Sequence, residues 1–338
     1  MSGKCLVVLL LAAAIAQADQ QFAGIGDLQL VGGGAIEHCR VGYRTDGTLN
    51  ADKSNVIVMP TWFGGTAEEL ERFGIIGPGK LADTDKYYVV AIDALANSVS
   101  CSPSNSHAVG GGPVPAIAIE DMVNSQYRLL TEQLGFRHVR AVMGISMGGM
   151  QTYQWVASYP DFMDKAVPIQ GTPRQTSFDL IQWRTHKNLI RALQAHGASE
   201  HEIGELITDV NLLTLFTPDY FVKTLPPEKV PEYMAQMRAG RVSFHADDYV
   251  AQLEAMIGQD VTGTGEAGAK AYAGRVRADV LIVGVTSDHM VNPGPGEALA
   301  PKIGAESLVV NDICGHVGTD CQAAEKKIGD RVAAFLAD

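Results

Sequence analysis

The sequence predicts an α/β fold, a mostly parallel central sheet with helices on both faces and one helical cap insertion. Two observations predict it. Short apolar runs alternate with helical segments along the chain, and this alternation is interrupted once, over residues 177–272, where helical segments follow one another with few strand signals. Nearly continuous apolar strands that alternate with helices are typical of parallel sheets covered on both faces. We therefore expect one core built from residues 19–176 and 273–338.

The expected elements follow in chain order. Strand character begins at residues 28–31 and 35–43, and further strands are expected at the apolar runs 55–59, 87–92, 139–143 and 165–169. Apolar residues at helical spacing predict helices over 121–134 and 148–158, and helical segments of the insertion at 189–195 and 249–257. After the insertion we expect strands at 280–285 and 307–310, a helix near Glu297 and a closing helix at 323–337.

The N-terminal residues have the pattern of an export signal. Lys4 supplies a positive charge, residues 6–15 are an unbroken apolar run, and Ala16-Gln17-Ala18 is an A-x-A cleavage site. The run is too short to span a bilayer comfortably as a permanent helix, and no other segment reaches the apolar length of a membrane span. We expect residues 1–18 to be removed as a signal peptide and the mature chain to be periplasmic or secreted.

The composition favours a globular protein that acts on a small molecule. Apolar residues make up 46% of the 338 residues and charged residues 19%, which leaves enough apolar material for a sizeable core. The formal net charge is −12 and the chain has no Lys/Arg run, whereas proteins that bind nucleic acid or anionic membranes are generally basic. We therefore expect a small-molecule substrate and no nucleic-acid partner.

Four cysteines remain once Cys5 is removed with the signal, namely Cys39, Cys101, Cys314 and Cys321. An even number of cysteines in an oxidising compartment is consistent with disulfides, and three pairings are open. Cys314 and Cys321 lie close together on either side of His316, so they are one candidate pair, and four buried free thiols are the alternative. The spacings fit no zinc motif, so no metal site is expected.

The candidate nucleophile is Ser146, in the G-x-S-x-G sequence Gly144-Ile145-Ser146-Met147-Gly148. This motif stands between an expected strand and an expected helix, which is the context of a nucleophile elbow in an α/β-hydrolase fold. The serine must sit on a strained turn with its hydroxyl clear of the sheet, and the residues two before and two after it must be very small. The alternative is a glycine-rich strand–helix turn without chemistry.

A serine hydroxyl needs an imidazole to accept its proton, and the imidazole needs a carboxylate to orient it. In this fold the acid and the histidine follow the serine in that order along the chain. We expect the histidine to be His316, in a glycine-flanked loop after the last strand, and the acid to be Asp288, in the loop after residues 280–285. The alternatives are His289, His245 and His107 for the base and Asp312 for the acid.

Two backbone N–H groups are expected to hold the oxyanion. The residue after the nucleophile supplies one of them, so Met147 is the first donor. The second should come from the loop after residues 55–59, where Trp62 is the expected donor. This chemistry requires no metal and no organic cofactor.

The chain resembles the homoserine O-acetyltransferase-like branch of the α/β hydrolases. The resemblance is carried by GISMGGMQTYQWVASYPD at residues 144–161, and by shorter matches at residues 102–105, 119–123 and 134–136. It implies Ser146, Asp288 and His316 as a triad, and Met147 and Trp62 as the oxyanion donors. It also implies acetyl chemistry and a homodimer formed through the insertion.

The sequence departs from this family where the substrate would be recognised. Transferases of the family typically carry an aspartate directly after the catalytic histidine, and here that residue is Val317. The insertion also lacks a clear match to the arginine and tyrosine that hold the homoserine carboxylate, because Arg174, Arg184 and Arg191 are better explained as surface charge. We therefore predict hydrolysis of short-acyl carboxylic esters. The alternatives are an O-acyltransferase with an alcohol acceptor and, from another class, a non-catalytic binding protein on the same fold.

Overall fold

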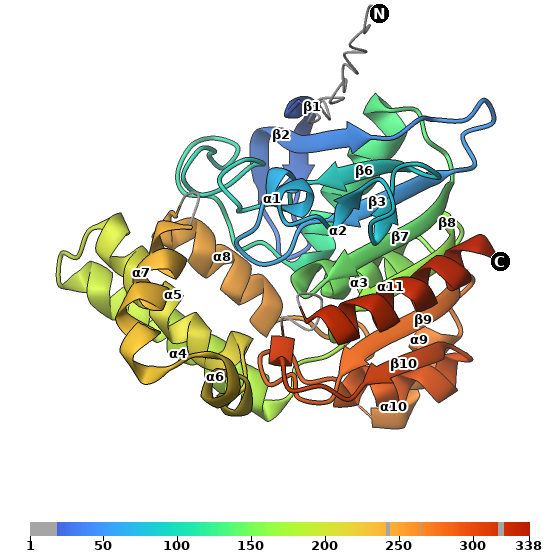
Figure 1. The fold of residues 1–338 in the computed structure, drawn as a ribbon. Coiled ribbons are helices and arrows are strands. Elements are labelled where there is room, and N and C mark those ends of the chain that lie inside the picture. Colours follow the sequence, from blue (N-terminus) through green and yellow to red (C-terminus); the bar gives the residue numbers. More distant parts are fainter. Residues whose placement is uncertain (1–18, 241–243, 264, 317–320) are drawn as a thin grey trace, which may run out of the picture.

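The computed structural model describes residues 19–240, 244–263, 265–316 and 321–338, and an eight-stranded sheet lies at its centre (Figure 1). In spatial order its strands are β1 (Gln21–Gln29), β2 (Ala35–Asp46), β6 (Tyr88–Ile92), β3 (Val56–Pro60), β7 (Val139–Ile145), β8 (Met163–Ile169), β9 (Asp279–Val285) and β10 (Glu306–Val310). β2 pairs antiparallel with β1 and with β6, and the other neighbours are parallel. The carboxyl ends of β3, β7, β8, β9 and β10 therefore meet at one edge. A small second sheet pairs β4 (Ile76–Gly77) with β5 (Ala82–Asp83).

Helices cover both faces of the large sheet. They are α1 (Ala67–Arg72), α2 (Ile119–Arg128), α3 (Met147–Ser158), α10 (Gly294–Ile303) and α11 (Gln322–Ala337). Because successive strand residues point to opposite faces, Val58 belongs to one hydrophobic core with residues of α2, α3 and α10, whereas Ile57 belongs to another with residues of α1 and α11. Both positions are fully buried. The predicted α/β-hydrolase fold class is thus confirmed, with near-continuous apolar strands between two helical layers.

The expected helix over residues 121–134 has two parts. Helix α2 ends at Arg128 and is followed by one π-helical turn, η1 (Leu129–Gln133), in which Leu134 N donates to Leu129 O at 3.1 Å. Wider turns of this kind occur mostly as single-turn insertions in helices. Apolar spacing alone cannot distinguish a π turn from a continuing α-helix.

Helices fill the segment between β8 and β9. They are α4 (Ser177–Ala195), α5 (Glu200–Leu215), α6 (Pro218–Thr224), η2 (Pro227–Lys229), α7 (Val230–Ala239), α8 (Ala246–Ile257) and α9 (Gly265–Ala273). Figure 1 shows α4 to α8 as a group beside the sheet, at its carboxyl edge. Helix α9 lies instead against α10, and the hydroxyl of its Tyr272 donates to Tyr153 O of α3 at 3.0 Å.

Local sequence explains where the longest of these helices begins. The Thr176 hydroxyl accepts from Asp179 N at 3.3 Å, and the Asp179 carboxylate accepts from Thr176 N at 2.7 Å. This reciprocal capping box satisfies two of the donors that a helix start leaves without partners. The second oxygen of Asp179 accepts from Asn292 N at 3.2 Å, which fixes the start of α4 to the loop after β9.

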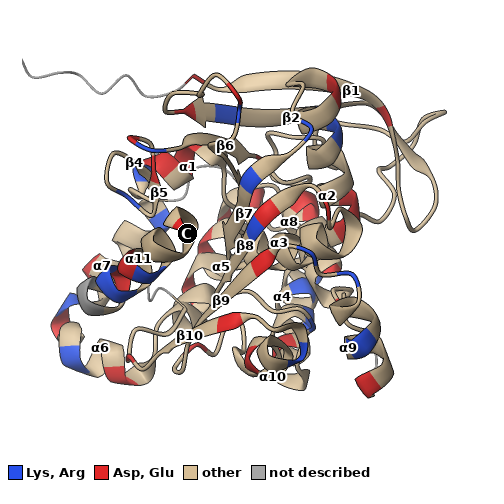
Figure 2. Cartoon of the chain, turned by 90° about the vertical axis from the view of Figure 1, so that its right-hand side faces the viewer, with Lys and Arg blue, Asp and Glu red and all other residues tan. Residues whose placement is uncertain are grey.

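Acidic and basic residues alternate along the chain in the view that shows α11, α10 and α9 (Figure 2). Within the described residues, no helix combines the length and the apolarity that a membrane crossing requires. The expected signal peptide, residues 1–18, and Val317 lie outside the described residues.

Candidate active site

Ser146 lies on a sharp turn between β7 and α3. Its backbone has φ 59° and ψ −121°, a strained conformation for a residue with a side chain. Two glycines permit this turn, because a Cβ at Gly148 would lie 2.6 Å from Pro60 O and a Cβ at Gly144 would collide with the backbone of Gly148. The turn therefore has the geometry of a nucleophile elbow.

The structure brings the three predicted triad residues together at the carboxyl edge of the sheet. His316 Nε2 lies 2.8 Å from Ser146 Oγ, and His316 Nδ1 lies 2.7 Å from Asp288 Oδ2. Ser146 is 8% exposed, His316 7% and Asp288 4%, so the line of hydrogen bonds is shielded from water. In this arrangement the imidazole can take the hydroxyl proton while the carboxylate holds it in the required tautomer.

The Asp288 carboxylate is held on both of its oxygens. Oδ1 accepts from Met290 N at 3.0 Å and from Val291 N at 2.9 Å, while Oδ2 accepts from His316. The loop after β9 folds back on its own aspartate and leaves one oxygen for the imidazole. A carboxylate restrained in this way fixes the orientation of the histidine ring.

Gln170 is a contributor to this site that the sequence did not reveal. It directly follows β8, has φ 47° and is 3% exposed. Its Nε2 donates to Asp288 Oδ2 at 3.1 Å and to Gly315 O at 3.2 Å, so one amide group bridges the acid loop and the histidine loop. The only sequence signal is a polar residue at the carboxyl end of a buried strand.

The two expected oxyanion donors belong to the elbow and to the loop after β3. Met147 is the first residue of α3, where backbone N–H groups have no partner within the helix. Trp62 lies in the loop after β3, and Gly65 N donates to Trp62 O at 3.0 Å. Within the described part of the chain, neither Met147 N–H nor Trp62 N–H is used in a hydrogen bond to protein.

The insertion restrains the loop that contains Trp62. Gln252 of α8 is fully buried; its Oε1 accepts from Gly64 N at 2.8 Å and its Nε2 donates to Leu95 O at 3.0 Å. Nearby, the ring of Phe63 lies 4.1 Å from that of Tyr249, centroid to centroid. Helix α8 thus restrains the backbone next to the second expected donor, a contact that no sequence motif indicated.

The alternative acid and bases have other positions. Both ring nitrogens of His289 lie 3.1 Å from backbone oxygens, those of Ser287 and Leu213. His107 and His245 are exposed, and Asp312 accepts from Cys314 N at 2.8 Å, as a turn residue does. Of the candidates, Asp288 and His316 are the ones aligned on Ser146.

All four cysteines of the described chain are paired. Cys314 is bonded to Cys321, with Cα atoms 6.3 Å apart, and Cys39 is bonded to Cys101, with Cα atoms 5.6 Å apart. The first disulfide closes the loop that contains His316. Asp312 lies beside it, but a disulfide leaves no thiolate to hold a metal ion at that position.

Comparison with known proteins agrees with this geometry. No protein-family model matches the chain. The "Probable esterase" of Corynebacterium glutamicum is 31% identical over 321 residues, which cover 89% of this chain and 90% of that protein. The ethyl acetate hydrolase of Pseudomonas veronii is 39% identical over 162 residues, 48% of this chain and 46% of that protein. The homoserine O-acetyltransferase of Pelobacter propionicus is 30% identical over 322 residues, which cover 82% of this chain and 85% of that protein.

Solved structures extend the likeness to the whole fold. An acetylester hydrolase from Corynebacterium glutamicum superposes with a TM-score of 0.82 at 28% identity, covering 94% of this chain and 97% of that chain. The acetyl esterase MekB superposes with a TM-score of 0.85 at 26% identity, covering 95% and 98%. The chain therefore belongs to the homoserine O-acetyltransferase-like branch of the α/β-hydrolase superfamily, which includes esterases as well as transferases.

Proposed function

We propose that this enzyme hydrolyses carboxylic esters with short acyl groups through an acyl-enzyme on Ser146. The observation that carries the proposal is the continuous line of hydrogen bonds from Ser146 Oγ through His316 to Asp288, at 2.8 and 2.7 Å. Ser146 Oγ attacks the ester carbonyl while His316 Nε2 takes its proton, and Met147 N–H and Trp62 N–H hold the oxyanion. His316 then returns the proton to the leaving alcohol, and the acyl group stays on the serine.

Deacylation repeats these steps with water as the nucleophile. His316 takes a proton from water, the hydroxide attacks the acyl carbonyl, and collapse of the second tetrahedral intermediate returns the proton to Ser146. The carboxylic acid leaves and the enzyme is restored. Every proton transfer uses a side chain of the site, so the reaction requires no cofactor.

Hydrolysis is favoured over transfer because the sequence has no clear match to the groups that would hold an amino-acid acceptor. Arg174 and Arg184 are exposed, and Arg191 pairs with Asp247 of α8. Val317, next to the histidine, cannot balance an ammonium group. The ethyl acetate hydrolase and acetyl esterase relatives support water as the acceptor.

Short acyl groups are favoured by the aromatic residues around the oxyanion loop. The Phe63 ring lies 4.1 Å from Tyr249 and 6.0 Å from Trp183, centroid to centroid, and Trp62 precedes it. Rings packed in this way leave little freedom for a long chain next to the elbow. The test is hydrolysis of p-nitrophenyl esters from acetate to octanoate. We expect kcat/KM to be highest for acetate or propionate, and a maximum at octanoate would contradict the short-acyl proposal.

The second candidate function is O-acyl transfer, which the homoserine O-acetyltransferase relatives favour. Both reactions share the acyl-enzyme, so the partition of the acyl group distinguishes them. With p-nitrophenyl acetate as donor and homoserine or ethanol as added acceptor, a hydrolase forms mainly acetate at an unchanged rate. Formation of mainly the new ester would favour the transferase.

We propose further that the enzyme acts outside the cytoplasm. The charge, apolar run and cleavage pattern of residues 1–18 support this, as do the two disulfides, which persist mainly in oxidising compartments. N-terminal sequencing of the protein from a fractionated host tests it. A mature N-terminus at Asp19 in the exported fraction is expected, and intact Met1 in the cytoplasm would contradict export.

We also propose a homodimer formed through the insertion. Large apolar side chains are exposed on several of its described helices, among them Ile181 of α4, which is 65% exposed, Leu213 of α5 at 71% and Val222 of α6 at 85%. Exposed large apolar side chains that come together in one patch favour association. The test is the oligomeric state of Val222→Asp, measured by sedimentation. Val31→Asp is the control, because Val31 is also an exposed valine but lies far from the insertion in the sequence. A dimer that dissociates only in the first variant is expected; a wild-type monomer would contradict it.

A further inference from the structure

A line of buried amide groups ends on the peptide bond that carries the second oxyanion donor. Gln151 of α3 is fully buried, and its Nε2 donates to Thr61 O at 3.0 Å and to Met147 O at 3.2 Å. Thr61 O and Trp62 N–H belong to one peptide unit. Because that unit is planar and trans, its C=O and N–H point in opposite directions. A hydrogen bond to Thr61 O therefore orients Trp62 N–H.

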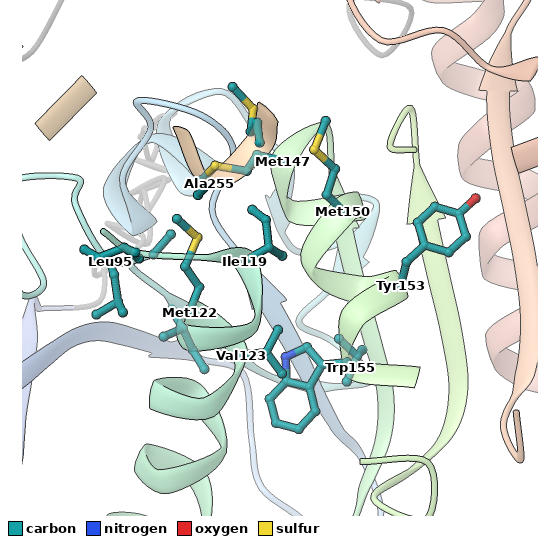
Figure 3. Packing of buried hydrophobic residues seen from close by; sticks show 14 of the residues in the cluster. Leu95, Ile119, Met122, Val123, Met147, Met150, Tyr153, Trp155 and Ala255 are labelled. Atoms are coloured by element: carbon teal, nitrogen blue, oxygen red, sulfur yellow. The ribbon is translucent and has the colours of Figure 1, made fainter. Parts of the chain in front are cut away.

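Two further buried side chains extend this line. The Nε2 of Gln126 on α2 donates to Gln151 Oε1 at 2.6 Å, and Trp155 Nε1 donates to Gln126 Oε1 at 2.8 Å. Gln126 and Trp155 are fully buried. Figure 3 shows the Trp155 indole beside Val123 of α2, with Met150 and Met147 nearer the start of α3. The line thus runs from Trp155 through both glutamines to Thr61.

The direction of every hydrogen bond in this line is determined by its first member. An indole N–H can only donate, so Gln126 must turn its oxygen toward Trp155 and its NH2 toward Gln151. Gln151 must in turn present its oxygen to Gln126 and its NH2 to Thr61 O. Neither amide can be flipped without leaving a buried donor facing a donor or an acceptor facing an acceptor.

We propose that Trp155, Gln126 and Gln151 form a relay that aligns and polarises the Thr61–Trp62 peptide, so that Trp62 N–H is preorganised for the oxyanion. Each glutamine is a positioning residue, because it acts through a peptide bond and touches no reacting atom. Hydrogen bonds in a chain strengthen one another, and donation to a C=O makes the N–H of the same peptide a better donor. The inference rests on the proposed function, since it assigns a role within the same acyl transfer.

The rest of the loop is consistent with this role. Thr61 N donates to Ile92 O at 3.1 Å, and the Thr61 hydroxyl accepts from Ala94 N at 3.0 Å. Together with the bond from Gln151, these contacts restrain Thr61 at its N–H, its hydroxyl and its carbonyl. A donor fixed before the substrate arrives requires no reorganisation during the reaction.

The experiment compares Gln151→Met and Gln126→Met with Gln154→Met. Methionine has a length similar to glutamine but cannot donate. Gln154 is the matched control, because it is a buried glutamine of the same helix whose Nε2 donates to Ser158 Oγ, at 2.9 Å. For each protein, kcat and KM on p-nitrophenyl acetate, the rate of Ser146 phosphonylation by a fluorophosphonate, and the melting temperature are measured.

We expect kcat to fall about tenfold or more in Gln151→Met and several-fold in Gln126→Met, with KM nearly unchanged, because an oxyanion donor acts on the transition state. Phosphonylation should slow in parallel, and Gln154→Met should match the wild type in both rates. If Gln151→Met does not fold, Gln126→Met carries the test, because Gln126 contacts neither Thr61 nor Met147 through a hydrogen bond.

A lower melting temperature with unchanged kcat and phosphonylation in Gln126→Met would overturn the relay and leave the network a purely structural role. Equal losses in Gln154→Met would overturn it as well. Failure of the wild type to hydrolyse any ester would contradict the proposed function instead. The phosphonylation rates would still decide on the relay in that case, because they require only Ser146 and its oxyanion site.

Discussion

The side-chain amide of Gln170 donates a hydrogen bond to Asp288 Oδ2, at 3.1 Å, the same carboxylate oxygen that faces His316 Nδ1 at 2.7 Å. Gln170 therefore shares the acceptor on which the orientation of the imidazole depends. Its second bond, to Gly315 O at 3.2 Å, connects that acceptor to the loop of the histidine itself. A residue directly after β8 thus bridges the carboxylate of the acid and the backbone next to the base.

Gln170→Met should lower kcat about tenfold and change KM little, because loss of the hydrogen bonds to Asp288 Oδ2 and Gly315 O loosens the alignment of the triad without removing any member. Gln170→Glu should lose more activity, since a second carboxylate would face Asp288 at hydrogen-bond distance. Steady-state kinetics on p-nitrophenyl acetate measures both effects. Gln259→Met is the control, because Gln259 is also buried but donates to Met150 O. Equal kcat in Gln170→Met and the control would contradict a positioning role.

The two disulfides should differ in what they stabilise. Cys39 and Cys101 are 62 residues apart and Cys314 and Cys321 only 7, so the chain-entropy model assigns them about 4 and about 2–3 kcal/mol of stability, respectively. The short loop, however, contains His316. The double variant Cys39→Ser, Cys101→Ser should lose more free energy of unfolding, measured with denaturant. The double variant Cys314→Ser, Cys321→Ser should lose more kcat. The opposite ranking in either measurement would refute this division of roles.

Gly148→Ala should impair both folding and catalysis, because the new methyl group would lie 2.6 Å from Pro60 O next to the elbow. Overpacking of this kind costs about 1–3 kcal/mol in free energy of unfolding. Gly329→Ala in α11 is the control, since a Cβ there has nothing within 4 Å, and alanine in a helix should stabilise by about 0.5–1 kcal/mol. The melting temperature and kcat of both variants test this prediction. A Gly148→Ala protein as stable and active as the wild type would show that the turn can relax.

The buried carboxyl of Asp93 should make stability depend on pH. Its pKa is raised from 3.8 because burial disfavours the charged form, although Ala67 N, Asn97 and Gln20 donate to it. A carboxyl with a higher pKa in the folded state binds more protons there than in the unfolded state, so its contribution to stability declines as pH rises above 3.8 toward the folded pKa. Asp93→Asn should therefore gain stability relative to the wild type as pH rises through this range. Urea unfolding of both proteins at several pH values measures how the difference in their free energies of unfolding changes with pH. A difference that does not change with pH would contradict the prediction.

Much of the fold and the core of the site follow from local sequence. Buried strands such as β7 are recognisable in the sequence as apolar runs. The turn at Ser146 requires small residues on both sides, which the sequence also shows. Chain order and strand ends predicted Asp288 and His316, and the structure places both in one line of hydrogen bonds with Ser146. These features can be predicted because each depends on residues that are close together in the sequence.

The supporting residues could not be found in that way. Gln170 reaches Asp288 across 118 positions, and Gln252 reaches Gly64 across 188. A glutamine on a helix or at a strand end has no local pattern that reveals its distant partner. The pairing of Cys39 with Cys101 likewise depends on the spatial placement of β2 beside the loop after β6. Long-range polar contacts become visible only once the sheet order is known.

The central claim is that Ser146 carries the acyl group and that water removes it. Its most direct test is acid quenching of the enzyme during p-nitrophenyl acetate turnover, followed by mass spectrometry of the peptide that contains Ser146. We expect one acetyl group on that serine in the wild type, and neither acetylation nor hydrolysis above background in Ser146→Ala. Hydrolysis that persists in Ser146→Ala, or an acetyl group found on another residue during turnover, would contradict the account.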